Sequence, residues 1–180
     1  MINILFPINK SVPSDYKYYD SFLHSLSDKL RKNNINVTYL LFSNNFYDGS
    51  KSRTLITGKN SKNNYKSISE FEKIYEFSLR EILYTDLLQT SKFIHKTRGR
   101  NWFIPDSEFQ EHENYKNKLN EIENLIRSNK YTFVFADQTT DYEINFIKYV
   151  CKKINLPFIR YLPNFMNRGF FASYINDIYG

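Results

Sequence analysis

The sequence predicts one folded α/β domain, in which an open parallel sheet of about four to five strands carries helices on both faces. Its 180 residues are enough for a single domain with a core and too few for two ordinary ones. The chain holds 15 Tyr and 16 Phe, and burying so much ring surface favours folding over disorder. Short apolar runs alternate with amphipathic stretches, which is the order that parallel strands with helical crossovers require.

The first part of the chain predicts a strand, a helix and a second strand. Residues 2–6 are apolar and stop at Pro7, which is typical of a buried strand followed by a loop. Between Asp15 and Arg31 the apolar residues recur at helical spacing, and Asn33 and Asn34 end that pattern. In residues 35–42 apolar side chains occupy alternate positions, which predicts the second strand. Strands joined by a helical crossover pair in parallel.

The middle of the chain predicts a loop and then helices. Residues 43–67 are rich in Ser, Asn and Lys and contain no acid after Asp48, so we expect a flexible basic surface loop. Residues 68–95 have a helical apolar pattern and predict either two helices or one bent helix. After a loop, Asp106 or Ser107 could cap a long helix that ends at Ser128.

The last third predicts a second strand–helix–strand unit. Residues 131–136 form the third expected strand, and a polar turn, 137–141, leads into a helix that stops at Leu156 and Pro157. Residues 158–162 form the fourth strand. From 163 to 180 we expect an irregular aromatic tail. Residues 1–180 are therefore interpreted as one domain.

Composition narrows the classes of partner. The net charge of +6 and the isoelectric point of about 9.2 favour phosphates, nucleotide sugars, acidic glycans, a membrane surface or nucleic acid, although an AT-rich genome explains abundant Lys equally well. The single cysteine, Cys151, excludes a disulfide within the chain and is expected in the core. No apolar run of about 18 residues and no signal peptide are visible, so we expect a cytoplasmic protein that is at most peripheral at the inner face of the membrane.

The polar turn after the third strand is the leading candidate site. In open α/β sheets ligands bind at the carboxyl ends of the strands, and the helix that follows offers free N–H groups. Asp137 could act as a base or bind a hydroxyl group, while Gln138, Thr139 and Thr140 could bind substrate. The alternative is that Thr139, Thr140 or Asp141 simply caps the helix, and one residue can do both.

Basic residues follow the fourth strand. Arg160, Asn164, Asn167 and Arg168 are expected to crowd its exit and to line one cleft with Asp137. The alternative is a structural salt bridge between Asp137 and either Arg160 or Arg168.

A second basic group precedes Trp102. Within it, Arg98 and Arg100 could bind phosphate or a glycan carboxylate, because guanidinium groups match oxyanions in shape. Cations at a helix C-terminus, where they compensate the helix dipole, explain the group equally well.

The sequence lacks the motifs of several common types of active site. No glycine-rich phosphate loop follows any expected strand, and no serine-hydrolase elbow is present. The three histidines are scattered without metal-ligand spacing. We therefore expect neither a dinucleotide cofactor nor an obligatory metal.

Two blocks of the sequence resemble the N-terminal half of surface- and capsule-polysaccharide biosynthesis proteins. Those proteins are similar to glycosyltransferases with two facing Rossmann-like domains, the GT-B architecture. The resemblance extends from about Ile68 onward and loosely includes the first strand–helix–strand unit. It is found in residues 71–75 and 79–86, in Ala136-Asp137, in residues 156–158, and in residues 164–168 with Phe171.

The resemblance implies a Rossmann-like domain that binds a glycan acceptor. A second domain holding the nucleotide sugar would follow the tail, so the partners are a glycan acceptor or nucleotide sugar and that second domain, a partner chain or a second copy. The reaction would be direct displacement of a nucleoside diphosphate by a sugar hydroxyl, with Asp137 as the base. No cofactor is implied beyond the nucleotide sugar as donor substrate.

Two alternatives remain open at this point. The chain could be a non-catalytic, flavodoxin-like binding module that works with another chain, in which case it should expose an apolar face or self-associate. Nucleic-acid binding through the basic loop is the least supported, because residues 51–66 contain only one aromatic side chain, Tyr65.

Overall fold

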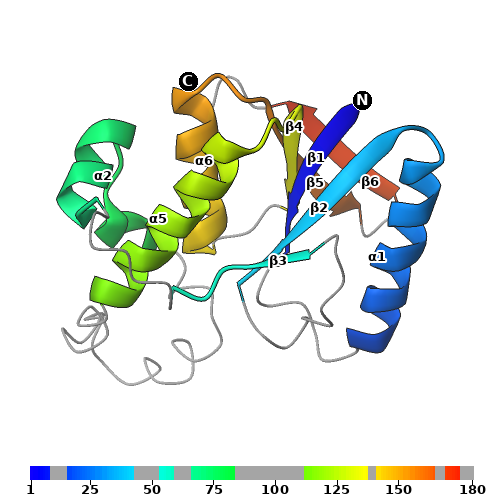
Figure 1. Ribbon diagram of the computed structural model, residues 1–180, viewed down its shortest axis with the longest axis horizontal. Helices are drawn as coiled ribbons and strands as arrows, with labels where there is room; N and C mark the ends of the chain where they lie inside the picture. Colours follow the sequence, from blue (N-terminus) through cyan, green and yellow to red (C-terminus); the bar gives the residue numbers. More distant parts are fainter. Residues whose placement is uncertain are drawn as a thin grey trace.

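A single sheet runs through the molecule (Figure 1). The computed structural model describes residues 1–8, 16–42, 53–58, 66–83, 112–137, 141–164 and 169–174. The strands are β1 (Ile2–Pro7), β2 (Ile35–Leu41), β3 (Arg53–Leu55), β4 (Phe133–Asp137), β5 (Phe158–Asn164) and β6 (Gly169–Tyr174). Their order in space is β3-β2-β1-β4-β5-β6. The first five are parallel and β6 is antiparallel to β5, which confirms the predicted open parallel sheet.

Helices cover both faces of the sheet, as predicted. Helix α1 (Tyr16–Arg31) lies on one face, while α2 (Ile68–Tyr75), α5 (His112–Ser128) and α6 (Tyr142–Lys153) lie on the other (Figure 1). The chain leaves β1 toward one side of the sheet and leaves β4 toward the opposite side. Connections between parallel strands are usually right-handed crossovers. Because these two run in opposite directions along the sheet, their helices α1 and α6 lie on opposite faces.

The two faces have separate cores because side chains alternate along each strand. Leu5 and Leu40 pack against α2, α5 and α6, whereas Phe6 and Tyr39 belong to the cluster on the α1 side. There the Ser27 hydroxyl donates a hydrogen bond of 2.9 Å to the Tyr39 oxygen and joins α1 to the sheet.

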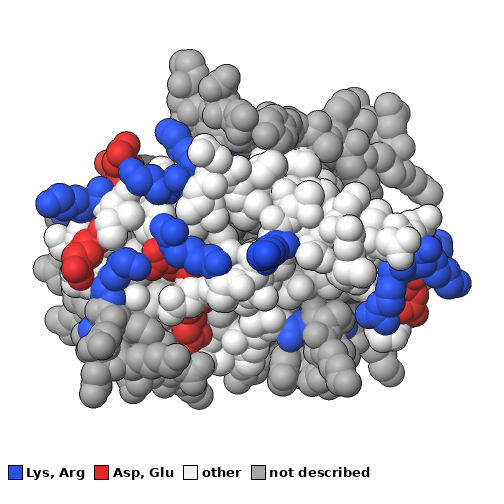
Figure 2. Space-filling view, turned by 45° about the horizontal axis from the view of Figure 1, so that its top comes forward, with Lys and Arg blue, Asp and Glu red and all other residues white. Residues whose placement is uncertain are grey.

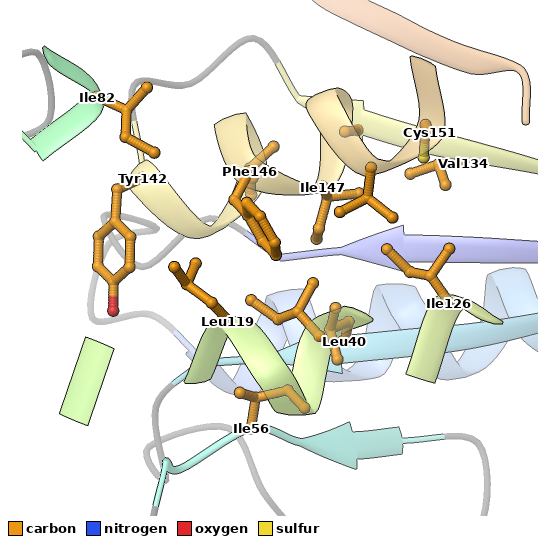
Figure 3. Packing of buried hydrophobic residues seen from close by; sticks show 14 of the residues in the cluster. Leu40, Ile56, Ile82, Leu119, Ile126, Val134, Tyr142, Phe146, Ile147 and Cys151 are labelled. Carbon is orange, nitrogen blue, oxygen red and sulfur yellow. The ribbon is translucent and has the colours of Figure 1, made fainter. Parts of the chain in front are cut away.

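The larger core lies between the sheet and the helices α5 and α6. Figure 3 shows its side chains interdigitating from both layers, among them Leu119, Phe146 and Val134. Phe146 also makes perpendicular ring contacts with Phe71 and Tyr75 of α2, at centroid distances of 5.4 and 5.6 Å. A further member, Cys151, is fully buried, and burial raises the pKa of its thiol, which confirms the predicted core role.

The helical stretch that begins at residue 68 is interrupted, in agreement with the two-helix alternative. Ser67 and Glu70 form a capping box at the start of α2, with the Ser67 N–H donating 2.7 Å to Glu70 Oε2. Glu76 adopts a left-handed conformation, φ 55°, and ends α2. Helical residues resume at 79–83, where the Leu79 N–H donates to the carboxylate of Glu72 at 2.8 Å.

Two predictions of irregular structure were wrong. The expected loop at 43–67 contains β3, which pairs with Tyr39–Leu41 at the sheet edge. The expected irregular tail, 163–180, contains β6, and β5 continues through Pro163 to Asn164. Strands β3 and β6 are held by backbone hydrogen bonds to neighbouring strands, and the periodicity of side chains does not reveal such partners. Pro163 is tolerated within β5 where the sheet needs no N–H group from that residue.

Smaller differences concern element boundaries. The third predicted strand begins at Phe133 and not at Tyr131, and α1 starts at Tyr16. The described part of α5 begins at His112, so its predicted caps, Asp106 and Ser107, lie outside the described residues.

Candidate functional site

The sheet has one point where its connections reverse direction, between β1 and β4. The chain leaves β1 for β2 and leaves β4 for β5, so the segments that follow these two neighbouring strands diverge at the carboxyl edge. In open α/β sheets such a divergence opens the crevice in which ligands bind. Asp137 is the last residue of β4 and lies at this point, with the first turn of α6 beginning five residues later at Tyr142.

The other predicted site residues are only partly described. Asn164 ends β5, and for both Asn164 and Asp137 the structure describes the strand position and not the side chain. Outside the described residues lie Gln138, Thr139, Thr140, Asn167, Arg168, Arg98 and Arg100. Their predicted roles in substrate binding therefore stay predictions.

Arg160 lies elsewhere than predicted. It was expected at the exit of its strand, but β5 extends to Asn164, and Arg160 pairs in register with Ala136 inside the sheet. Register partners in parallel strands share a face, and Ala136 belongs to the core beneath α6. Arg160 therefore lies on the α6 side of the sheet, and the register places Tyr161, not Arg160, beside Asp137.

Two lysines of α6, Lys148 and Lys152, contribute positive charge near Arg160 on that side. Burial, together with the nearby positive charges of Arg160 and Lys152, lowers the pKa of the Lys148 ammonium to about 8. The Lys148 ammonium also lies 5.6 Å from the centre of the Tyr149 ring. Arg160 thus belongs to a cationic group on the flank of α6, and the register does not place it beside Asp137.

A buried ion pair that the sequence analysis missed lies at the start of α6. Glu143 is fully buried in the first turn, and its Oε1 is 3.3 Å from the Nζ of Lys118 on α5. The Lys118 ammonium also lies 5.8 Å from the centre of the Tyr142 ring. Glu143 stands on the same helical stripe as Ile147 and Val150, so an acid at an inward position was the signal that could have revealed it.

Of the three residues considered as caps for α6, Asp141 does not cap the first turn, and Thr139 and Thr140 lie outside the described residues. Asp141 occupies the N-cap position and is buried, yet its side chain accepts no hydrogen bond from the first N–H groups of the helix. Glu143, inside the first turn, places a negative charge near the positive end of the helix dipole.

The segment after β3 closes this edge against α5. The N–H groups of Thr57 and Gly58 donate to Glu121 Oε2 at 3.2 and 3.3 Å. Gly58 has φ +71°, and a Cβ there would lie 2.9 Å from Lys118 Cγ and 3.0 Å from the carbonyl oxygen of Asn114. Only glycine allows so close an approach with this backbone conformation.

A second buried carboxylate, Glu123, is fully paired and has a structural role. It accepts hydrogen bonds from Tyr75, from Arg127 Nε at 3.0 Å and from Lys66 Nζ at 2.5 Å. Burial alone would raise the pKa of the Glu123 carboxyl, but the bonds from Lys66 and Tyr75 and the Lys66 charge outweigh it and lower that pKa. Burial together with the Glu123 bond raises the pKa of Tyr75 to about 12. The network joins α2 to α5.

The described surface has an open hollow at the opposite edge of the sheet. It measures about 360 Å³ and is lined by Ile126, Arg127, Asn129, Tyr131, Ile154, Asn155 and Leu156. These residues end α5 and α6 and lead into the amino ends of β4 and β5. The hollow is therefore separate from the switch point.

The sequence matches no protein-family model, and no curated protein or solved structure is significantly similar to it. The chain is therefore placed at the level of its fold, a Rossmann-like parallel α/β sheet. In the described residues no helix is long and apolar enough to cross a membrane.

Proposed function

We propose that this chain is the acceptor-side, N-terminal domain of a glycosyltransferase-like protein of surface-polysaccharide biosynthesis. The observation behind the proposal is the position of Asp137, which ends β4 at the point where the connections of the sheet reverse direction. An acidic residue at that point is suited to hydrogen-bond a hydroxyl group of a ligand in the crevice.

In the proposed reaction the Asp137 carboxylate accepts the proton of an acceptor hydroxyl. The hydroxyl oxygen then forms a bond to the anomeric carbon of the donor sugar, and the bond from that carbon to the nucleoside diphosphate breaks. The donor would be held by another domain. This chain would contribute the base and the acceptor site, and holding the hydroxyl close to the base supplies part of the rate enhancement.

The charge of the chain fits an acidic acceptor. The net charge of the chain is +6. A glycan with carboxylate or phosphate groups would be attracted by such a field.

The alternative of a non-catalytic interaction module finds less support. That alternative expects an exposed apolar face, but in the described ranges the exposed large hydrophobic side chains are Met1 and Ile2 alone. Among the side chains that the structure describes, no apolar partner-binding face is seen; those of residues 165–179, which could supply one, lie outside them.

The test is ligand binding by the chain and by two variants. Melting temperature and dissociation constant are measured with oligosaccharides rich in hexuronic acid and, separately, with UDP, GDP and CMP. A ligand that binds only the folded state raises the melting temperature. Asp137→Asn should weaken oligosaccharide binding about tenfold, since a hydrogen bond to a charged group contributes about 1.5–3 kcal/mol. Asp28→Asn, on the exposed face of α1, is the matched control.

The outcomes distinguish the acceptor-binding domain from the non-catalytic interaction module. Binding of oligosaccharides that Asp137→Asn weakens, and that Asp28→Asn at the opposite edge of the sheet does not weaken, supports the proposal. Nucleotide binding by the wild-type chain would contradict the assignment of the donor to another domain. An absence of binding to all these ligands would favour the interaction module.

A further inference from the structure

The amino edge of the sheet gathers the C-terminal ends of three helices. Each helix that connects parallel strands runs back to this edge, so α1, α5 and α6 all end there (Figure 1). Their last turns carry the basic residues Lys29 and Arg31, Arg127, and Lys152 and Lys153. Lys32 and Lys130 follow α1 and α5 directly. We call this surface the amino-edge patch.

Most of these cations make no ion pair within the part of the chain that the structure describes. Arg127 bonds to Glu123, and Lys153 lies 3.6 Å from Glu76. The remaining side chains are exposed and form no ion pair or hydrogen bond with a described residue; they are Lys29, Arg31, Lys32, Lys130 and Lys152. Asp28 is the exposed acid at the end of α1. In Figure 2, which turns this edge toward the reader, a blue group with a single red neighbour lies over the end of α1.

Helix dipoles account for only part of this charge. Three helix C-termini present roughly half a negative charge each, about 1.5 in total. The lysine and arginine side chains without a described partner carry more positive charge than the helix ends and Asp28 together carry negative charge. The amino-edge patch therefore has a net positive field of its own.

Apolar side chains lie on the same edge. Met1 is 89% exposed and Ile2 is 41% exposed, at the start of the central strand β1. Asn3 Nδ2 donates 3.1 Å to the carbonyl of Lys130, and the Ile2 N–H donates 3.4 Å to the carbonyl of Asn34, so these apolar residues lie between the basic ends of α1 and α5.

From this arrangement we infer that the amino-edge patch docks the domain on an anionic lipid surface. The lysine and arginine side chains would contact acidic headgroups, and Met1 and Ile2 would enter the interfacial region. Nucleic acid is a poorer fit, because no aromatic side chain is exposed among the described residues of this edge to stack on bases. The inference is independent of the proposed function, and it leaves the carboxyl edge facing away from the bilayer.

The experiment is sedimentation of the chain with phosphatidylcholine vesicles that contain or lack phosphatidylglycerol, at low and high salt. We expect binding only to the acidic vesicles, and loss of it at high salt. Lys29→Gln, Arg31→Gln and Lys32→Gln together should lower the partition coefficient about a hundredfold, or roughly fivefold for each charge near the surface. Asp28→Asn should raise it about fivefold.

A matched pair of single variants locates the contact. Lys130→Gln, at the edge, should weaken binding about fivefold, whereas Lys116→Gln, in the first half of α5, should not. Circular dichroism confirms that each variant is folded. Equal binding to neutral vesicles, equal effects of the two single variants, or tighter binding to a DNA duplex than to acidic vesicles would overturn the inference.

Discussion

Replacing Glu123 with Gln keeps the shape of a buried side chain and removes its charge. Glu123 is 2% exposed and is the common acceptor for Tyr75 of α2, Arg127 of α5 and Lys66. The amide offers one oxygen where the carboxylate offers two. The variant should therefore weaken the attachment of α2 to α5 without opening a cavity.

The magnitude follows from how well each donor can return to water. Lys66 and Arg127 are 39% and 47% exposed, so both can be rehydrated, whereas the Tyr75 hydroxyl is buried and depends on this acceptor. A hydrogen bond to a charged group contributes about 1.5–3 kcal/mol. We expect a loss of about 2–3 kcal/mol in the free energy of unfolding. In a chain of this length that lowers the melting temperature by roughly 5–10 °C.

The effect should depend on pH in a defined direction. The pKa of the Glu123 carboxyl is lowered in the folded state from its ordinary value of 4.5. The carboxylate therefore stabilises the folded state fully above about pH 4.5, and this contribution is lost as the pH falls through the lower folded pKa. The difference between wild type and Glu123→Gln should be constant near neutral pH and should shrink below that range.

The assay is urea unfolding followed by circular dichroism, at neutral pH and at several acidic pH values. Glu76→Gln is the matched control, because Glu76 is 81% exposed and its surface ion pair with Lys153 should contribute less than about 1 kcal/mol. If Glu123→Gln costs no more than Glu76→Gln, the buried network does not stabilise the fold and the reasoning fails.

Two further predictions concern close packing. Gly58→Ala should destabilise the domain by about 2 kcal/mol or more, because the new Cβ would combine a positive φ with contacts to Asn114 and Lys118; urea unfolding measures the loss, and Asn114→Ala in the same chain should recover part of it. The Cys151 thiol should resist iodoacetamide in the native state, since it is fully buried and burial raises its pKa, and it should be alkylated at the rate of a free cysteine in urea. Rapid native alkylation, followed by mass spectrometry, would show that α6 opens from the core.

The sequence was informative where local pattern and burial coincide. The sequence alone predicts β1 and β4 from their apolar runs, because buried parallel strands are continuously hydrophobic. It predicts α6 from its apolar stripe, because the buried face of a helix repeats every three to four residues. The break after Tyr75 was left open between two helices and a bend. No glycine or proline marks that break, and the left-handed conformation of Glu76 becomes visible only in the structure.

The candidate site was predicted less completely than the fold. The end of β4 at Asp137 follows from the polar turn that succeeds an apolar strand. Arg160 was misplaced because the length of β5 depends on its pairing with β6, a partner that hydrophobic periodicity does not indicate. Glu143 was missed because its partner Lys118 lies on another helix, so the sequence around Glu143 shows its inward position but not the cation that pairs with it.

By itself, the sequence determined the α/β class, the parallel pairing and the core position of Cys151, since these depend on spacing along one segment. The tertiary structure decided the strand order, the antiparallel edge strand β6 and the pairing of Glu123 and Glu143 with lysines distant in the chain. It also decided that the cations ending α1, α5 and α6 share one edge. Each of these features arises from contact between residues far apart in sequence, and a local pattern contains no information on which distant residue will be the neighbour.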